Sequence, residues 1–386
     1  MQPASMSRRA ALRGVGLITG GLVLGQSLPG QTNSRRQKPY VVDPADAAAH
    51  HIRHFTPVNV ASERIIRTVV GLRPFRPSGF VVKAESLGDK LLVHNYGHGG
   101  GGVTLSWGTA ELAAELVTES GRTGNAAVIG CGAVGLATAR TLQRRGFDVT
   151  IYAKALPPET TSNISGASWF PSFVFEQAKR TAAFDAQFDR AAHIANRIFQ
   201  GLIGEYYGVR WREQYFLTDE PFDEPIDAGR LHDLYPASRR LKPREHPFPA
   251  KYVQVDNTMF IEPPVYLNAL MRDFQIAGGR IRRTTFAEVQ QLGALSESVV
   301  VNCTGLGARE LFGDRELVPI KGQLTVLLPQ SDVDYAMTTE DLYMFPRRDG
   351  IMLGGTHERG VETLTPNLEA EQRILAAHKR IFDGMK

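Results

Sequence analysis

The stretch from Asn125 to Lys154 constrains the fold more than any other part of the chain. A short apolar run opens it, and Gly130, Gly132 and Gly135 follow in the pattern G-x-G-x-x-G. Apolar residues at helical spacing and a second β-rich run come next. This order predicts a strand, a tight turn, a helix and a second strand, which together begin a dinucleotide-binding fold. The first turn of the helix would present free N–H groups to a pyrophosphate.

The residue after the second strand does not identify the dinucleotide. An acidic residue that binds ribose is expected there, and this chain has Lys154. The motif therefore indicates a dinucleotide without saying which one. An NAD-dependent dehydrogenase stays open on the glycine pattern alone.

The composition excludes some classes of protein. The chain has 386 residues, of which 42% are hydrophobic, enough for one large or two ordinary domains. The formal net charge of +4 owes much to arginines in the first 36 residues, so it does not argue for nucleic-acid binding. Cys131 and Cys303 each follow an apolar run, and we interpret them as small packing residues. No histidine and cysteine spacing predicts a metal site.

The N-terminal segment resembles a bacterial twin-arginine export signal. Arg8 and Arg9 precede a glycine-rich apolar run at 15–24, which is too short to span a bilayer comfortably. We therefore expect residues 1–39 to be an export signal and linker, and the protein to be periplasmic or secreted without a stable membrane span. This route carries folded proteins, which suits a tightly held cofactor.

Two stretches before the glycine motif carry chemistry. Arg73 and Arg76 each precede a proline, which favours extended backbone, and arginine is suited to two-point binding of a carboxylate. Further on, residues 94–104 run from a strand end into a glycine-packed turn and then a helix. This predicts a second helix N-terminus able to stabilise negative charge, with room for a flat ring against the backbone.

Farther along, the pattern predicts mostly helix at 176–215 and irregular structure at 216–250. A strand at 251–262 and a helix from Pro263 to Phe274 follow.

Taken together, these motifs resemble the D-amino-acid oxidase family of FAD enzymes. The segments that carry the resemblance are GLRPFRP, HNYGHGGGGVTLSWG, AVIGCGAVGLATA, IYAKALPPETTSNISGASWFP, VVVNCTGLGAREL, KGQLTVL and LYMFPRRDGIMLGGT. The resemblance implies an α/β fold, with a Rossmann-like FAD-binding domain and a mixed-sheet substrate domain. We expect the FAD-binding domain at 64–175 and 280–315, and the substrate domain at 176–279 and 316–386.

The order of the segments differs from that of the family. There the arginine and the HNYGHGG stretch close the chain, whereas here they precede the FAD motif. We interpret this as a circular permutation, with a joint at 119–125 whose polar and glycine residues tolerate rewiring.

The resemblance also implies the roles of individual residues. Arg73 would pair with the substrate carboxylate with help from Tyr343, and the Gly100 carbonyl would accept a hydrogen bond from the amine. Phe170 and Thr339 depart from family residues of the pocket, and the mobile lid is trimmed. The residues implied at FAD are Gly99, Gly100, Gly102, Val103, Thr104, Gly130, Gly132, Val134, Gly135, Lys154, Thr160, Thr161, Ser162, Gly166, Ala167, Ser168, Arg283, Thr304 and Gly305.

The implied reaction is oxidation of a D-amino acid by hydride transfer from Cα to flavin N5. Oxygen would then regenerate the flavin with release of hydrogen peroxide, and water would convert the imine to a 2-oxo acid and ammonia. A glycine or sarcosine type of amine oxidase, and a catalytically degenerate flavin-binding protein, are the alternatives. The sequence specifies neither the natural substrate nor the oligomeric state.

Overall fold

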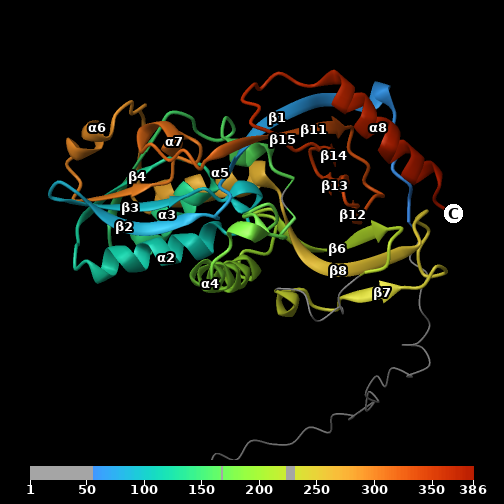
Figure 1. Cartoon of the computed structure of the whole chain (residues 1–386), viewed down its shortest axis with the longest axis horizontal. Helices are drawn as coiled ribbons and strands as arrows, with labels where there is room; N and C mark the ends of the chain where they lie inside the picture. The colour runs from blue at the N-terminus through green and yellow to red at the C-terminus, as the bar shows by residue number, and fades with distance from the viewer. Residues whose placement is uncertain (1–54, 167, 223–230) are drawn as a thin grey trace, which may run out of the picture. The chain divides into compact units, whose positions relative to one another are not determined.

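The computed structural model describes residues 55–166, 168–222 and 231–386. The predicted export segment and Ala167 lie outside the described residues. The described part belongs to one compact unit, from Ile52 to Lys386. It contains two sheets with helices packed against them (Figure 1).

The first sheet has six strands and contains the predicted dinucleotide motif. All neighbouring strands are parallel except the first pair, which is an antiparallel hairpin. In spatial order the strands are β2 (Val81–Leu87), β3 (Lys90–Tyr96), β10 (Val299–Asn302), β4 (Asn125–Ile129), β5 (Asp148–Ala153) and β9 (Arg280–Arg283). The predicted strand, turn, helix and strand are confirmed as β4, α3 (Ala133–Arg144) and β5.

The second sheet has nine strands. In spatial order these are β1 (Ile65–Phe75), β11 (Val318–Leu327), β14 (Gly350–Gly354), β13 (Tyr343–Arg347), β12 (Ala336–Thr338), β6 (Val209–Thr218), β8 (Tyr252–Ile261) and β7 (Arg239–Leu241), and β15 (Glu358–Arg359) pairs with β11. All pairs are antiparallel except β12 with β6. Successive side chains along each strand point to opposite faces of the sheet, so each face carries every second side chain.

Helices bury the apolar faces of both sheets. The longer ones are α2 (Ser106–Glu119), α4 (Ala182–Gln200), α5 (Pro263–Ile276) and α8 (Leu368–Asp383), and the short ones are α6 (Val289–Gly293) and α7 (Gly307–Leu311). The α2 helix packs on α3 and α4, with Trp107 fully buried in the largest core cluster. The α8 helix packs on β11 and β14 (Figure 1). No helix among the described residues combines the length and apolar character needed to cross a membrane.

The prediction of helix throughout 176–215 is wrong at its C-terminal end. The α4 helix ends at Gln200, and β6 begins at Val209. Gly204 and Gly208 have positive φ angles of 140° and 62°, which no helix accommodates, so the chain turns there. Ile203, which continues the apolar spacing of the predicted helix, is 43% exposed. Residues 216–250, predicted as irregular, include the end of β6 and the short strand β7.

Two structural features bear on the order in which the segments follow one another along the chain. The α2 helix ends at Glu119, and a turn with positive φ at Gly121 and Gly124 leads directly into β4. At the other end of the unit, the hydroxyl of Tyr335 donates to the backbone oxygen of Thr56 at 3.0 Å and lies 3.7 Å from Sδ of Met385. The beginning and the end of the described chain are therefore neighbours.

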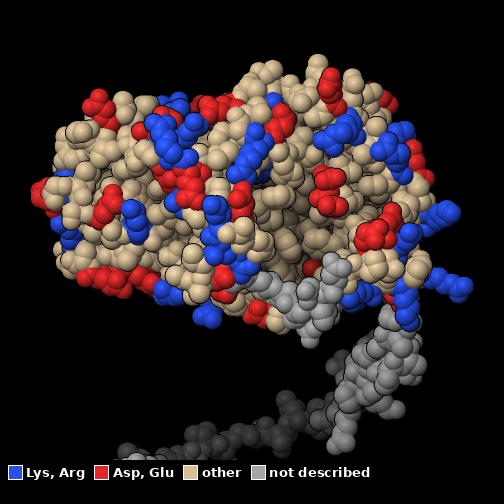
Figure 2. All heavy atoms as spheres, viewed as in Figure 1, with Lys and Arg blue, Asp and Glu red and all other residues tan. Residues whose placement is uncertain are grey.

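Lys, Arg, Asp and Glu side chains are interspersed on the face shown in Figure 2. This agrees with the small net charge of the chain.

Candidate active site

Three turns predicted from separate motifs meet at one edge of the six-stranded sheet. The strands β3, β10 and β4 are parallel neighbours, so their carboxyl ends lie together. Asn302 of β10 is in register with His94 of β3 on one side and with Ile129 of β4 on the other. The turns that follow these strands are 97–104, 303–305 and 130–135. The carboxyl edge of such a sheet is where open α/β folds bind their ligands.

The turn at 130–135 fits a pyrophosphate. Gly130 has φ of 118°, and a Cβ there would lie 2.4 Å from the backbone oxygen of Cys303. A Cβ on Gly135 would lie 2.1 Å from the backbone oxygen of Gly130. The N–H of Ala133 donates to Oγ of Ser162 at 3.0 Å, so the first turn of α3 already holds an acceptor oxygen. Glycines that admit a close backbone approach beside a helix N-terminus suit a dinucleotide phosphate.

The turn at 97–104 packs against a loop that follows the predicted cofactor segment. The N–H of Gly100 donates to the backbone oxygen of Phe173 at 3.0 Å. A Cβ on Gly99 would lie 2.1 Å from that same oxygen, so only glycine fits. Gly100 is exposed, and no hydrogen bond to its carbonyl oxygen is found in the described part of the chain. Val103 and Thr104 are buried, Gly102 is half-buried, and the Thr104 hydroxyl donates to the backbone oxygen of Gly101 at 3.2 Å.

The turn at 303–305 approaches β1. Thr304 donates to Oδ1 of Asn302 through both its N–H and its hydroxyl, at 3.1 and 2.7 Å. Gly305 has a positive φ of 58°, and a Cβ there would lie 3.8 Å from Pro74, the residue after Arg73. This turn therefore connects the six-stranded sheet with the strand that carries the predicted substrate-binding arginine.

The segment at 160–168 connects the two sheets. Thr160 is buried and bonds to Asn163, and Ser162 caps the first turn of α3 as described above. A Cβ on Gly166 would lie 3.3 Å from Cε2 of Tyr343 in the nine-stranded sheet. The hydroxyl of Ser168 donates to Oε1 of Gln214 on β6.

The remaining sequence-predicted cofactor residues lie farther out. Thr161 is exposed, and Val134 is half-buried in the first turn of α3. Lys154 is exposed directly after β5. Arg283 is exposed at the end of β9 and forms an ion pair with Glu159 at 3.0 Å. Lys154 and Arg283 therefore lie at the carboxyl ends of adjacent strands, at the same edge of the sheet.

Arg73 and Tyr343 share one face of the nine-stranded sheet. Gly71 is in register with Gly322 of β11, and Arg73 is two residues further along β1, so its side chain has the same orientation. A Cβ on Gly322 would lie 2.3 Å from Nη1 of Arg73. Gly354 of β14 pairs with Tyr343 of β13, and a Cβ there would lie 2.5 Å from the Tyr343 hydroxyl. Arg73 thus lies over Gly322 of the neighbouring strand β11, and Tyr343 lies over Gly354 of the neighbouring strand β14.

The surroundings of Arg73 leave its charge without a carboxylate. Nη1 donates to the backbone oxygen of Thr356 at 3.3 Å. Among the described residues, no Asp or Glu lies within ion-pair distance of the half-buried Arg73. A cationic fork of this kind is suited to an anionic ligand.

Sequence reasoning missed His357 and Phe173, which lie beside these groups. The ring of His357 packs against that of Phe173 at a centroid distance of 4.3 Å, with the two planes tilted by 30°. Partial burial, and then the charge of Arg73, lowers the pKa of His357 to about 4 although the residue is exposed by area. Phe173 is 50% exposed and has a positive φ of 53°. The position of His357 directly after the strand motif LGGT was the signal available in the sequence.

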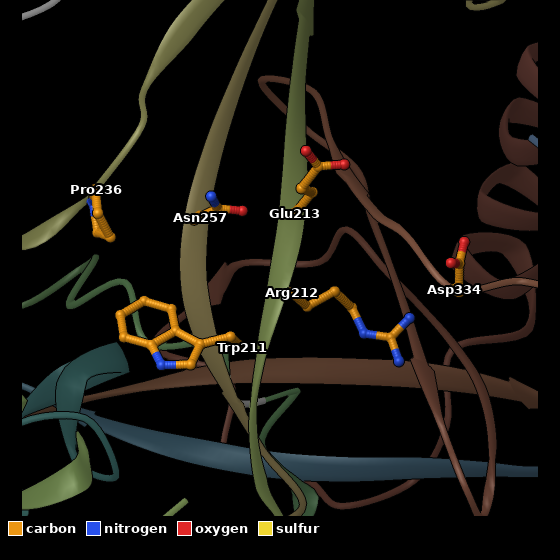
Figure 3. A pocket seen from close by; sticks show the side chains of 6 residues that line it. All are labelled: Trp211, Arg212, Glu213, Pro236, Asn257 and Asp334. Carbon is orange, nitrogen blue, oxygen red and sulfur yellow. The ribbon is translucent and has the colours of Figure 1, made fainter. Parts of the chain in front are cut away.

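A separate surface hollow lies away from these residues. Its volume is about 570 Å³, and it opens over β6 and β8 (Figure 3). None of the sequence-predicted site residues lines it, so we do not assign the reaction to it. The residues that line the hollow are Trp211, Arg212, Glu213, Pro236, Asn257 and Asp334.

Comparison with known proteins agrees with the geometry. The family model described as FAD dependent oxidoreductase (DAO) matches residues 10–116 and 125–386. The chain belongs to this family. Its cofactor is therefore FAD, and it is an oxidoreductase with the α/β fold expected above.

Two proteins of known name and one solved structure show how similar this chain is to known proteins. A D-amino-acid oxidase of Dictyostelium discoideum is 31% identical over 260 residues, which cover 65% of this chain and 71% of that protein. A D-aspartate oxidase of Homo sapiens is 30% identical over 263 residues, with 66% and 74% covered. The crystal structure of a glycine oxidase from Bacillus cereus covers 67% of this chain and 77% of that one, with 16% identity and a TM-score of 0.48.

Proposed function

We propose that this protein oxidises a D-amino acid to the imino acid, which hydrolyses to the 2-oxo acid and ammonia, with release of hydrogen peroxide. The observation that carries the proposal is the position of Arg73. Its guanidinium has no carboxylate partner among the described residues and shares a sheet face with the hydroxyl of Tyr343. The names of the two relatives, a D-amino-acid oxidase and a D-aspartate oxidase, support the same substrate class.

The residues of this chain would bind and orient the substrate. Arg73 holds the α-carboxylate through two parallel hydrogen bonds, and the hydroxyl of Tyr343 donates a third. The carbonyl of Gly100 accepts from the substrate amine. Bound FAD supplies a hydride acceptor that dioxygen can regenerate. Because this reaction depends on alignment of Cα, we assign no side chain as a catalytic base.

The cofactor residues follow from the three turns. We assign the pyrophosphate to the turn at 130–135, with Ser162 as its neighbour, and the flavin to the turn at 97–104. Thr304 and Gly305 would contact the part of FAD between the pyrophosphate and the flavin. Lys154 and Arg283, which lie at the carboxyl ends of adjacent strands, would lie near the adenosine part of FAD. On this assignment the FAD-binding domain comprises residues 64–175 and 280–315, and the substrate domain comprises 176–279 and 316–386. Arg73 reaches the substrate from the FAD-binding range, because β1 pairs with β11 of the nine-stranded sheet.

One experiment tests the activity directly. Purified protein should be yellow, and its flavin absorbance should bleach anaerobically when a D-amino acid is added. Parallel samples with the L-enantiomer and with glycine serve as controls. Bleaching by glycine alone would favour the glycine oxidase type of reaction, and bound flavin that no amine bleaches would contradict the proposed activity.

We infer that the chain order reflects a circular permutation within the DAO family. The family model matches in two parts separated by 117–124, which overlaps the polar joint at 119–125. The contacts of Tyr335 with both Thr56 and Met385 support it, because they bring together the two ends that an unpermuted chain would connect. Exposed, glycine-containing turns such as 120–124 are where such rewiring is tolerated.

We also propose twin-arginine export to the periplasm or the exterior of a bacterial cell. The support is the Arg8-Arg9 pair before a short apolar run. Replacement of both arginines by lysine should leave the protein in the cytoplasm, as measured by fractionation of expressing cells. Unchanged export of that variant would contradict this assignment.

A further inference from the structure

A chain of hydrogen-bonded side chains connects β2 with the turn after β10. Nε2 of His94 lies 3.0 Å from Oε1 of Glu85, and Nδ1 of His94 lies 3.0 Å from Nδ2 of Asn302. Oδ1 of Asn302 accepts from both the N–H and the hydroxyl of Thr304. His94 and Asn302 are buried, whereas the Glu85 side chain is 44% exposed. A buried imidazole therefore lies between a partly exposed carboxylate and the turn at 303–305.

The hydrogen-bonding capacity of these groups defines the tautomer of His94. The N–H of Thr304 can only donate, so the atom of Asn302 that faces it is the amide oxygen. The amide nitrogen, which also only donates, consequently faces His94. Nδ1 of His94 must then be the acceptor, and Nε2 carries the hydrogen and donates it to Glu85. The neutral imidazole satisfies every one of these bonds.

We propose that neutral His94 is a positioning residue that holds the turn of Thr304 and Gly305 through Asn302, and that its protonation releases this turn. The proposal rests on the proposed assignment of that turn to FAD. Protonated His94 has a hydrogen on both ring nitrogens, so Nδ1 and the Asn302 amide nitrogen become two donors facing each other. Rotation of the amide would relieve this conflict, but it would present Nδ2 to the N–H of Thr304. The bonds of Asn302 to the turn are then lost.

The charged groups around His94 set the pH at which its imidazole takes up a proton. Burial lowers the pKa of His94 below its ordinary value of 6.5, and the hydrogen bond to Glu85 opposes that effect. Lys83 of the same hairpin also lowers the pKa, and Asp314 raises it. The rings of Tyr96 and Phe312 pack on the imidazole and carry no charge at these pH values. Proton uptake by His94 is therefore expected only below the ordinary range of histidine.

The test measures release of FAD from the holoprotein by recovery of flavin fluorescence as the pH is lowered from about 8 through the acidic range in which the parent stays folded. The parent protein is compared with His94→Asn, in which a non-titrating amide oxygen can take the place of Nδ1. His193→Asn is the control, because His193 is an exposed residue of α4 paired with Asp233. Loss of the bonds to Thr304 should weaken FAD binding in the acidic parent about tenfold. His94→Asn should show no such pH dependence, and His193→Asn should behave like the parent.

A second variant keeps the proposal testable if His94→Asn does not fold. Glu85 is half-exposed, so Glu85→Gln should leave the fold intact while it removes the carboxylate that favours protonation. Acidic release of FAD should then require a lower pH. Identical pH profiles for the parent and either variant would overturn the role of His94. The proposed function, which requires only that FAD is bound, would not be contradicted by that result. A purified protein without flavin absorbance would instead overturn the proposed function, and this inference with it.

Nitrogen NMR of the imidazole reports which ring nitrogen of His94 carries the proton. A merely structural role of His94 would not require one particular tautomer. At neutral pH, Nδ1 of His94 should be unprotonated and Nε2 protonated. The opposite tautomer would contradict the arrangement on which the inference depends.

Discussion

Arg73 lies across Gly322 so closely that a single methyl group there would come within 2.3 Å of its Nη1 atom. The glycine is on β11 and the arginine on β1, and the antiparallel register of these strands brings them together. The absence of a side chain at Gly322 thus defines where the guanidinium can lie. A proposed substrate-binding residue is held in place by a residue that makes no polar contact with it.

Replacement of Arg73 by alanine should raise KM for D-amino acids strongly. The variant loses a charge-assisted two-point contact, which costs on the order of 2–4 kcal/mol, or roughly 30- to 1,000-fold in binding. Arg67→Ala is a matched control on the same strand, because Arg67 is 42% exposed and pairs with Asp349. Steady-state peroxide assays provide the measurement. Equal KM values for the Arg73 variant and the parent would contradict the assignment.

Tyr343→Phe should raise KM by about fivefold, because one hydrogen bond to the substrate carboxylate contributes about 1 kcal/mol. The ring would still lie against Gly354, so the thermal midpoint should change little. Tyr335→Phe gives the complementary result. Its hydroxyl bonds to the backbone of Thr56, so that variant should lose stability and retain KM. A loss of stability without a change in KM in Tyr343→Phe would show that its hydroxyl is structural.

Gly130→Ala should abolish FAD binding. The new methyl group would lie 2.4 Å from the backbone oxygen of Cys303, and φ of 118° is unfavourable for any L side chain. Gly293→Ala is the control, because nothing lies within 4 Å of a Cβ at that position. The flavin-to-protein absorbance ratio measures the outcome. Normal flavin content in Gly130→Ala would show that this turn does not approach the cofactor.

His357 should titrate below its ordinary pKa of 6.5, at about 4, because of partial burial and then the nearby Arg73. A histidine with a lowered folded-state pKa takes up its proton first in the unfolded chain, so its contribution to stability declines as pH falls below 6.5. Arg73→Ala should raise the pKa of His357, since a repelling charge is removed. Proton NMR titration gives both values. An unchanged pKa in that variant would mean that the two side chains are not close.

A chain rejoined in the family order should fold and bind FAD. It would begin at Asn125, connect Lys386 to Phe55 through a short flexible linker, and end at Glu119. The contacts of Tyr335 show that the ends to be connected are already neighbours. Flavin absorbance and the thermal midpoint are the measurements. A colourless or insoluble product would contradict the proposed permutation.

The elements that the sequence predicted well are those governed by short-range patterns. The order of β4, α3 and β5 follows from apolar spacing and from glycines that are close in sequence, and the structure confirms it. The helix α5 was also predictable, because Pro263 begins it and Gly278 ends it with a positive φ of 84°. Helix was predicted too far beyond Gln200 because apolar residues continue at helical spacing, while the interrupting glycines act through backbone geometry.

The surroundings of Arg73 could not be predicted in the same way. Gly322, Thr356 and His357 reach it from parts of the chain far away in sequence, and only the strand order β1, β11, β14 brings them together. A pattern within one segment contains no information on that order. Each of the three turns was predictable by itself, but their common position depends on the order β3, β10, β4, which places the carboxyl ends of parallel neighbours at one edge.

The central place of β10 between β3 and β4 has a consequence during synthesis on the ribosome. His94 and its partner Asn302 are 208 residues apart in the chain. The hairpin of β2 and β3 therefore emerges early and must wait, with one edge open, until most of the polypeptide has been translated. Open strand edges are prone to aggregate, so we expect this chain to depend on chaperones during translation.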